Sequence, residues 1–542
     1  MHDKLKGMKS LKYFCFFTLL TLALFTNCAK RGTITGGDKD TIAPIILNSS
    51  PANFTTNFKE NTIEINFDEY VKLNKVNQQL IISPPMDIQP EITPMGYPSK
   101  FIKIKLFDTL QPNTTYSFNF GESIEDNNEG NKLLNFKYVF STGSYIDSLK
   151  LNTTYKDAYT KKSEGQVNVL LYQAENFTDS TIYKKKPLYV ATATDSLKQI
   201  SLENLKAGNY YIVALQEKNS NYKYEPKIDK IGFLPQPISV PNDSVINLTL
   251  FKERQPLNVN RPTMVSQNKW LVPYEGDIKN VKISTSSNSK QIANRIVKVP
   301  QKDSLYVFTP LEKLDSIQFR INESNFSKTY DVKTRNIKLV DTLQIKYIKQ
   351  GNFQFRDTLA FTNNTPISSI NKALISFHGK DSIQIPFDIK MDSLNNTVKI
   401  LFDKKENENY TFTLKENSVT DFYNNTNKTA LANKFSTGIY TDYGTITYKL
   451  NGNINYPVLF ELLTKKEEVY DFKYLTSETD LIKFTLVNPD KYFVRIIEDK
   501  NKNKQWDTGS YKDKLQPEKV FLFEKEFDIR ANWDINETIV LP

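Results

Sequence analysis

The chain has 542 residues, 39% of them hydrophobic, with 35 Phe and 29 Tyr; this excludes a disordered protein and a single hydrophobic core, and roughly three to five domains are expected. The net charge is +10, but lysines alternate with acids, as over residues 403–406, which favours a solvated surface over a nucleic-acid-binding stripe. The sequence has only two histidines, His2 and His378, which excludes a histidine-based triad and a histidine zinc cluster.

Residues 1–27 have the features of an export signal. Four lysines precede an apolar run over residues 14–25, and polar residues follow the run abruptly. As a helix this run rises only about 18 Å, short of the roughly 30 Å of bilayer hydrocarbon. We therefore expect a cleaved signal peptide rather than a spanning anchor.

Cys28 follows directly and is the expected lipidation site. Its context resembles a bacterial lipobox, although Phe25 and Asn27 depart from the usual Leu and small residue. The resemblance implies that Cys28 becomes the acylated, palmitate-type N-terminus of a lipoprotein. Cys15 would leave with the signal, so the mature chain would have one cysteine and no internal disulfide. An ordinary signal peptide with an incidental cysteine is the alternative.

Residues 28–42 are rich in glycine and charge and lack apolar periodicity, as expected of a tether. The segment resembles the start of Bacteroidota-type envelope lipoproteins, which implies the outer membrane as location. Surface-exported members often carry acidic residues just after the cysteine, where this chain has Lys30 and Arg31. The periplasmic and the surface face of the membrane therefore both stay open.

From residue 43 onward, aromatic and β-branched residues alternate in short stretches with turn residues about every eight to twelve positions. This pattern predicts an all-β fold of tandem antiparallel β-sandwich domains. A repeat about 295 residues apart supports it: 113–143 and 409–438 both end in Phe-Ser-Thr-Gly. Each copy places an aspartate, Asp126 or Asp421, in a polar loop between two short strands.

The first copy begins with a proline-rich entry at 43–51 and an Ile-Glu-Ile-Asn-Phe-Asp-Glu strand at 63–69. In this order the motifs resemble the S-layer-type bacterial Ig-like domain. The resemblance covers residues 43–145 and, more weakly, 337–439. It implies a seven-stranded sandwich and carries no chemistry.

A second pair of segments, 205–215 and 486–496, alternates apolar residues after a turn, which predicts the second strand of a hairpin. These segments resemble the transthyretin-like or carboxypeptidase-regulatory-like sandwich, which implies such β-modules over 146–254 and 440–542. Residues 255–336, with Trp270, Tyr274 and Phe308 in alternating runs, predict one more strand-rich unit, of no assigned family.

The most site-like constellation is Asp499, Asn501, Asn503 and Asp507, with oxygen side chains at positions 1, 3, 5 and 9. Calcium loops use this spacing because alternate residues of a tight turn point inward. The first repeat keeps it as Glu217, Asn219, Asn221 and Glu225. Position 12 is Ser510 and position 6 is Lys504, unlike an EF-hand, so a plain polar turn is the alternative. Calcium is expected to be structural at most, and no other cofactor is expected.

Asp followed by Ser or Thr and then a hydrophobic residue recurs along the chain and resembles the O-glycosylation acceptor of Bacteroidota-type exported proteins. A turn before a strand is the alternative explanation. The acceptor positions are Thr41, Thr109, Ser148, Ser196, Ser244, Ser304, Ser316, Thr342, Thr358, Ser382 and Ser393.

No phosphate-binding glycine loop or nucleophile elbow occurs in the sequence, so no catalytic residues are predicted. We expect a non-catalytic, structural or protein-interaction lipoprotein, with the membrane and other envelope proteins as partners. The alternatives are a glycan-binding lipoprotein that serves nutrient uptake and, without motif support, an envelope hydrolase.

Overall fold

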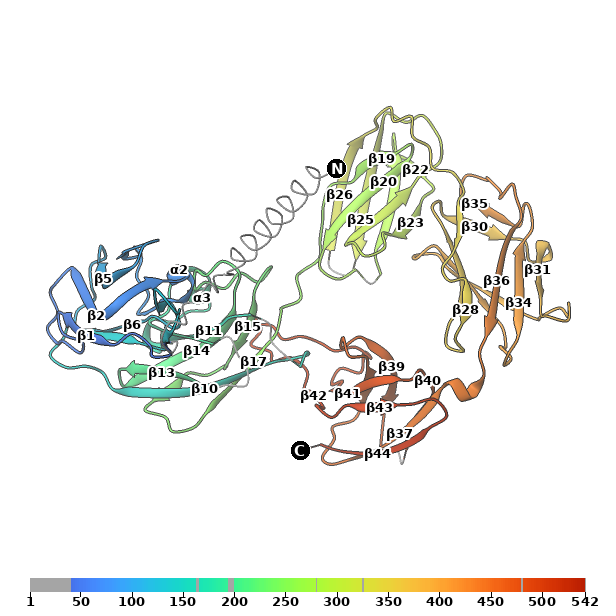
Figure 1. Ribbon diagram of the computed structural model, residues 1–542. Helices are drawn as coiled ribbons and strands as arrows, with labels where there is room; N and C mark the ends of the chain where they lie inside the picture. The colour runs from blue at the N-terminus through green and yellow to red at the C-terminus, as the bar shows by residue number, and fades with distance from the viewer. Residues whose placement is uncertain are drawn as a thin grey trace, which may run out of the picture. The chain divides into compact units, whose positions relative to one another are not determined.

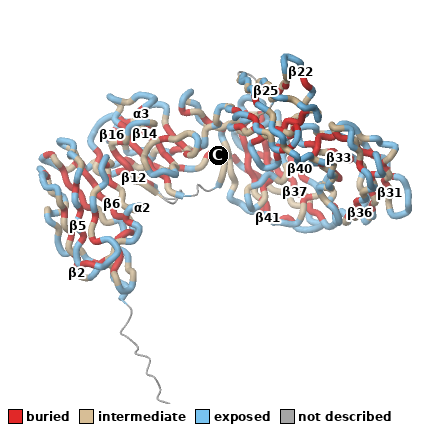
Figure 2. The backbone as a smooth tube through the Cα atoms, turned by 90° about the horizontal axis from the view of Figure 1, so that it is seen from above, coloured by how far each residue is buried: buried red, intermediate tan, exposed pale blue. Residues whose placement is uncertain are grey.

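The computed structural model describes residues 40–161, 165–193, 199–278, 280–323, 326–478 and 481–541. This part of the chain is a series of β-sandwiches built mainly from antiparallel strands, which confirms the predicted fold class (Figure 1). Five sandwich cores draw on residues 58–140, 151–250, 259–332, 353–435 and 446–541, here called sandwiches 1 to 5. Buried segments lie along the strands and exposed ones at the turns (Figure 2). One compact unit contains sandwich 1 and the other contains sandwiches 2 to 5.

Sandwich 1 packs the sheet β4-β5-β2-β7-β8, with β1 added on β2, against β3-β6-β9. Alternation explains the burial: Ile63, Ile65 and Phe67 of β2 face the core while their neighbours do not. Its elements are β1 (Ile46–Ser50), β2 (Thr62–Leu73), α2 (Val76–Gln79), β3 (Ile81–Ser83), β4 (Glu91–Thr93), β5 (Ser99–Lys105), β6 (Thr115–Asn119), β7 (Ile124–Asp126), β8 (Lys132–Leu133) and β9 (Lys137–Ser141).

Sandwich 4 repeats these pairings, with β29 and β30 together in the place of the long β2. In both copies a tyrosine hydroxyl accepts a backbone N–H five residues upstream: Tyr116 from Gln111 at 2.9 Å and Tyr410 from Lys405 at 2.8 Å. The elements are β27 (Ile345–Tyr347), β28 (Gly351–Phe353), β29 (Leu359–Asn363), β30 (Ile367–Ile370), η2 (Lys372–Leu374), β31 (Ile375–His378), β32 (Asp388–Asp392), β33 (Thr397–Leu401), β34 (Asn409–Leu414), β35 (Val419–Asp421) and β36 (Leu431–Thr437).

Sandwich 2 combines the sheets β13-β10-β17 and β12-β11-β14-β15, with β16 on β14. Strands β10 and β17 run parallel. Its elements are β10 (Leu149–Asp157), β11 (Val167–Gln173), η1 (Ala174–Asn176), α3 (Thr181–Lys184), β12 (Tyr189–Ala193), β13 (Ile200–Leu205), β14 (Gly208–Gln216), β15 (Lys230–Phe233), β16 (Ile238–Val240) and β17 (Ile246–Leu250).

Sandwich 5 has the same topology, β40-β37-β44 against β39-β38-β41-β42, with β43 on β41 and a parallel β37–β44 pair. Sandwiches 2 and 5 are therefore two copies of one design. The elements are η3 (Tyr440–Asp442), β37 (Gly444–Asn451), β38 (Val458–Leu463), β39 (Val469–Leu475), β40 (Ile482–Val487), β41 (Asp490–Glu498), β42 (Val520–Leu522), β43 (Phe527–Ile529) and β44 (Asp534–Val540).

The predicted hairpins at 205–215 and 486–496 are wrong. Strand β13 pairs with β10 while β14 pairs with β11, so the short connection crosses from one sheet to the other, and β40 and β41 do the same. Two tyrosines fix each crossing: Tyr189 and Tyr210 bond to the backbone of Lys206, and Tyr470 and Tyr492 bond to that of Asn488. Alternation identifies a strand that faces a core, but it does not identify the partner strand.

Sandwich 3 packs β18-β20-β24-β23, with β19 on β20, against β22-β21-β25-β26. Trp270 is fully buried and its ring lies 5.1 Å from that of Phe319 on the facing sheet. The strands are β18 (Asn258–Val259), β19 (Thr263–Ser266), β20 (Lys269–Glu275), β21 (Lys282–Ser287), β22 (Lys290–Ile292), β23 (Arg295–Lys298), β24 (Ser304–Phe308), β25 (Ser316–Glu323) and β26 (Phe326–Lys333). Within the described residues, no helix has the length and apolar character needed to cross a bilayer.

Candidate functional site: a duplicated polar turn at the joint of sandwiches 2 and 5

The four residues singled out in the sequence, Asp499, Asn501, Asn503 and Asp507, lie together in the turn that follows β41. The side-chain amides of Asn501 and Asn503 both donate to Oδ2 of Asp507, at 2.5 Å each. Asp499 is fully buried, and it accepts the backbone N–H groups of Asn503 (3.1 Å) and Lys504 (2.8 Å). The two carboxylates thus organise the turn from its two ends.

The equivalent turn after β14 has the same bonds in the same order. The amides of Asn219 and Asn221 donate to Glu225, at 2.8 and 3.0 Å. Glu217 accepts the N–H groups of Asn221 (2.8 Å) and Tyr222 (2.9 Å). The repeated spacing therefore corresponds to a repeated local structure.

A third carboxylate completes each turn and was missed by the sequence analysis. Glu518 accepts the N–H groups of Lys500 (2.8 Å) and Asp507 (3.0 Å), and Asp229 accepts the two equivalent ones in sandwich 2 (3.3 and 2.8 Å). Burial raises the pKa of Glu518 and of Asp229, and these N–H bonds act against the rise. Each carboxylate comes just before the returning strand, β42 or β15, which is the signal that could have found it.

The carboxylate oxygens of these turns are bonded mainly to N–H donors. In the part of the chain that the structure describes, no three His, Cys, Asp or Glu side chains are grouped so that they could hold a metal ion. A cation at Asp499 and Asp507 would have to displace the amide donors of Asn501 and Asn503, whose oxygens could then turn inward. Structural calcium stays a prediction.

Residues 508–517, here called the insert, lie between Asp507 and Glu518 and contact sandwich 2. The first copy has no equivalent, because only a few residues separate Glu225 from Asp229. Polar contacts of the insert and its flank are Arg254 Nη2 with Asp507 Oδ1 (3.0 Å), Thr508 Oγ1 to the Lys252 carbonyl (2.7 Å), Tyr511 N–H to Glu253 (2.6 Å), Lys514 with Asp179 (2.6 Å) and Gln516 to the Phe233 carbonyl (3.0 Å).

Tyr511 is the apolar anchor of the insert. Its side chain is only 2% exposed and its ring lies among Tyr183, Tyr224 and Phe233 of sandwich 2, with centroids 6.0, 6.4 and 5.1 Å away. Burial raises the pKa of Tyr511 far above its ordinary value. The hydroxyl of Tyr224 donates to Glu253 at 2.6 Å, which fixes one wall of this aromatic pocket.

A second part of the joint is a buried ion pair. Arg495 is 1% exposed and its Nε lies 2.6 Å from Oε2 of Glu461. Its guanidinium covers the ring of Tyr159 from sandwich 2 and donates to that hydroxyl at 2.7 Å. Burial raises the pKa of Tyr159, and the positive charge of Arg495 opposes the rise. Trp506 packs against Tyr159 at 4.7 Å. Sandwiches 2 and 5, distant in sequence, are joined by these contacts.

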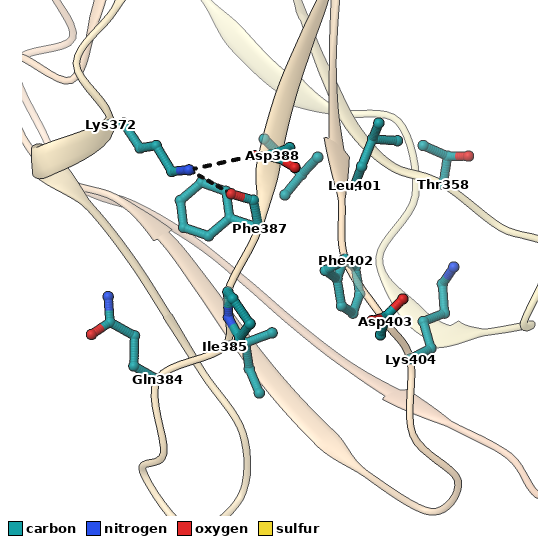
Figure 3. Close-up of a pocket in the computed structure, with 12 residues that line it drawn as sticks. Thr358, Lys372, Gln384, Ile385, Phe387, Asp388, Leu401, Phe402, Asp403 and Lys404 are labelled. Atoms are coloured by element: carbon teal, nitrogen blue, oxygen red, sulfur yellow. Dashed lines mark hydrogen bonds and ion pairs between the residues drawn. The ribbon is translucent and has the colours of Figure 1, made fainter.

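A pocket of about 740 Å³ opens in sandwich 4, where Gln384 and Ile385 pair with β31 before the chain enters β32 (Figure 3). Lys372 donates to the Phe387 carbonyl at 2.6 Å and lies 3.7 Å from Asp388. Lys404 donates to the Phe355 carbonyl at 3.0 Å, and burial lowers its pKa. Both cations are therefore occupied by the protein itself, and the pocket favours no ligand class.

Most described acceptor positions of the Asp-Ser/Thr motif are open to solvent. The exposed ones are Thr41, Thr109, Ser148, Ser244, Thr342, Thr358, Ser382 and Ser393, whereas Ser316 is half-buried and Ser304 buried. Burial of Ser304 fits the turn explanation at that position. The predicted signal peptide 1–27, Cys28, most of the tether and Ser196 lie outside the described residues.

Comparison with known proteins places one part of the chain. Residues 40–142 match a family described as bacterial Ig-like domain. None of the curated proteins compared with the sequence matches it. The chain is thus a tandem β-sandwich protein with a bacterial Ig-like module at its start, and Ig-like families are typically non-catalytic.

Solved structures with some likeness include the TIE protein of Bacillus anthracis, at 10% identity over 93% of this chain and 76% of that chain, with a TM-score of 0.14. A biofilm-associated protein BSP domain has 7% identity over 75% and 99%, with a TM-score of 0.14. The four N-terminal Ig domains of Dscam1 isoform 6.9 have 8% identity over 72% and 100%, with a TM-score of 0.15. At such scores nothing about this chain follows from these proteins.

Proposed function

We propose that this chain is a non-catalytic scaffold of the bacterial cell envelope, anchored to the outer membrane through an acylated Cys28, whose sandwiches hold other envelope proteins. The observation that carries the proposal is the joint. Two β-modules of one design, separated by two further sandwiches, are fastened by buried side chains that bind each other rather than a ligand. This suits a protein whose task is to fix the positions of attached surfaces.

The bacterial Ig-like module at 40–142 and the export-signal pattern before Cys28 also support an envelope role. Replacing Cys28 with Ser tests the anchor. In an envelope preparation washed without detergent, the parent chain should stay with the outer membrane and Cys28→Ser should be released. A variant that stays bound overturns the lipid anchor.

Pull-down from detergent-solubilised envelopes, followed by mass spectrometry, tests the scaffold role. The experiment has two arms, one with the parent chain as bait and one with Cys28→Ser added to solubilised membranes. Defined envelope proteins should be recovered in both arms. Recovery of no partner in either arm would overturn a protein-holding role while leaving the anchor result unaffected.

The glycan-binding alternative needs aromatic rings open to solvent. Of the three tryptophans, Trp270 is buried, Trp506 packs on Tyr159, and Trp533 is exposed with the Arg530 guanidinium 4.9 Å from its ring. Exposed tyrosines are present as well, namely Tyr70, Tyr97, Tyr145 and Tyr440, so the glycan-binding alternative has candidate rings. The hydrolase alternative needs carboxylates that face a substrate, whereas those of the polar turn are bonded to the protein's own N–H groups. We prefer the scaffold because the joint between sandwiches 2 and 5 supports it directly.

A further inference from the structure

Strand β39 is an edge of sandwich 5. It pairs with β38 on one side, and no described strand pairs with its other side. The backbone N–H of Phe472 donates to the carboxylate of Asp471, at 2.8 Å, rather than to a strand. Phe472 and Val469 are 52% and 44% exposed. A seven-residue edge with no neighbouring described strand and with exposed apolar side chains is able to pair with another strand.

The sequence of β39, Val-Tyr-Asp-Phe-Lys-Tyr-Leu, is self-complementary about Phe472. In an antiparallel pair with a second copy, Phe472 would face Phe472, and Asp471 would face Lys473 twice. Tyrosines and aliphatic residues would meet further out. Opposite charges and aromatic pairs that face each other across antiparallel strands stabilise the pair. The same charges disfavour most other strands, because a lysine and an aspartate on an edge discourage unmatched pairing.

We infer that β39 joins two copies of this chain by antiparallel, two-fold strand pairing centred on Phe472. In a two-fold interface the same surface patch of both copies meets, so the patch must be complementary to itself, and the sequence of β39 meets this requirement. The long edge strand β26 offers a contrast, because Lys328 and Tyr330 both donate to the Val259 carbonyl and Arg261 donates to the Asp331 carbonyl, which covers that edge. The inference is independent of the lipid anchor and of the partner proteins proposed above.

In the proposed dimer, Asp471 and Lys473 would have to bind the second copy while they keep contacts within their own chain. Asp471 also binds Arg356 at 2.7 Å, and Lys473 lies over the ring of Phe484 at 5.7 Å. Both side chains lie on the same face of the strand, so Asp471 can accept Lys473 of the second copy on its remaining lone pairs. Arg356 also donates to the carbonyls of Thr485 and Leu486 and lies over the ring of Tyr470, so Arg356→Met removes these contacts together with the internal ion pair.

Sedimentation velocity of the full chain in detergent, across a concentration series, tests the inference. The parent should form a concentration-dependent dimer. Asp471→Lys and Lys473→Asp each oppose like charges at two positions and should weaken the dimer about ten-fold or more. The double exchange, D471K with K473D, should restore it, whereas damage to the fold would not be rescued. A monomer at all concentrations, or a dimer indifferent to the single exchanges, overturns the inference.

Cysteine cross-linking fixes the register. Phe472→Cys, made on the chain with Cys28→Ser, should form a disulfide-linked dimer, since directly paired Cα atoms are about 5.5 Å apart, within disulfide range. Val469→Cys is the matched control. It is also exposed on β39, but its two copies would lie about 20 Å apart at roughly 3.4 Å per residue. Equal cross-linking of both variants, or none of either, overturns the two-fold register.

Discussion

The guanidinium of Arg495 lies 3.7 Å from the ring centre of Tyr159, a residue 336 positions earlier in the chain. The same guanidinium is bonded to Glu461 within its own sandwich. One buried cation therefore serves the fold of sandwich 5 and its attachment to sandwich 2. A desolvated cation over an aromatic face contributes up to about 2 kcal/mol.

Arg495→Met should destabilise sandwich 5 strongly, because Glu461 would remain buried without its partner. Loss of one member of a buried pair costs about 3 to 5 kcal/mol. Hydrogen exchange of the β38 and β41 amides in the full chain measures the change. The double variant Arg495→Met with Glu461→Leu should recover much of the protection, and Lys491→Met, from an exposed pair with Glu526, should cost at most about 1 kcal/mol.

Gly509→Ala should loosen the insert. A Cβ at this position would lie 2.6 Å from Cζ of Phe251 and 2.6 Å from the Leu515 carbonyl oxygen. Overpacking of this kind costs about 1 to 3 kcal/mol. Limited proteolysis of residues 508–517 should become faster, while Lys512→Ala, at an exposed position of the same insert, should be cleaved at the parent rate. Unchanged cleavage of Gly509→Ala would contradict the tight contact with sandwich 2.

Asp126→Asn should destabilise sandwich 1 in a pH-dependent way. Burial raises the pKa of Asp126, but N–H bonds from Glu129, Asn131, Gly130 and Asn128 outweigh it, and the pKa lies below its ordinary value. A lowered folded-state pKa contributes stability above the unfolded value, near 3.9, that is lost as the pH falls through the folded value.

The expected loss for Asp126→Asn is about 1 to 3 kcal/mol at pH 7, because Asn presents an N–H₂ group to backbone donors. Urea unfolding at pH 7 and below pH 3 measures it, and the difference from the parent should shrink in acid. Asn127→Ala, at a partly exposed position of the same loop, is the control and should change stability by about 0.5 kcal/mol or less. If the difference in the free energy of unfolding between parent and Asp126→Asn did not change with pH, the lowered pKa of Asp126 would be contradicted.

Calcium should raise the thermal midpoint of sandwich 5 if the polar turn binds the ion. At a hundred times its dissociation constant, a ligand that binds only the folded state adds about 2.7 kcal/mol. Differential scanning calorimetry with calcium and with chelator measures the shift, which Asp499→Asn should abolish. Glu217→Gln makes the corresponding change in the polar turn of sandwich 2, and its effect on the calcium-dependent shift is measured in the same way. A melt that millimolar calcium leaves unchanged would support the plain-turn alternative.

Periodicity and internal repetition were enough to predict the fold class, because a residue such as Phe67 signals its burial through its immediate neighbours. The members of the polar turn, Asp499 to Asp507, were equally local and could be found by spacing. Glu518 could not be found by spacing, because it lies 11 positions after Asp507, whereas Asp229 lies 4 positions after Glu225. The insert breaks the alignment of the two copies at that point.

The joint could not be predicted for a related reason. Arg495 alternates with the core residues Val494 and Ile496, so its place in the strand predicts an outward-facing, solvated side chain, and only the fold reveals that Tyr159 covers it. Alternation likewise predicted strands at 205–215 and 486–496 but did not predict their partner strands. Both sheets of a sandwich turn an apolar face toward the shared core, so alternation does not show to which sheet a strand belongs.

The contacts between sandwiches 2 and 5 also determine which part of the chain bears a mechanical force. Since Tyr511 and Arg495 attach sandwich 5 directly to sandwich 2, a pull between residue 147 and the end of sandwich 5 is borne first by these side chains. Sandwiches 3 and 4 would bear little of this force until the contacts of the joint break. Its rupture would transfer the load to sandwiches 3 and 4 while both are still folded, so the molecule would lengthen by the span of these two domains before any β-sandwich has to unfold.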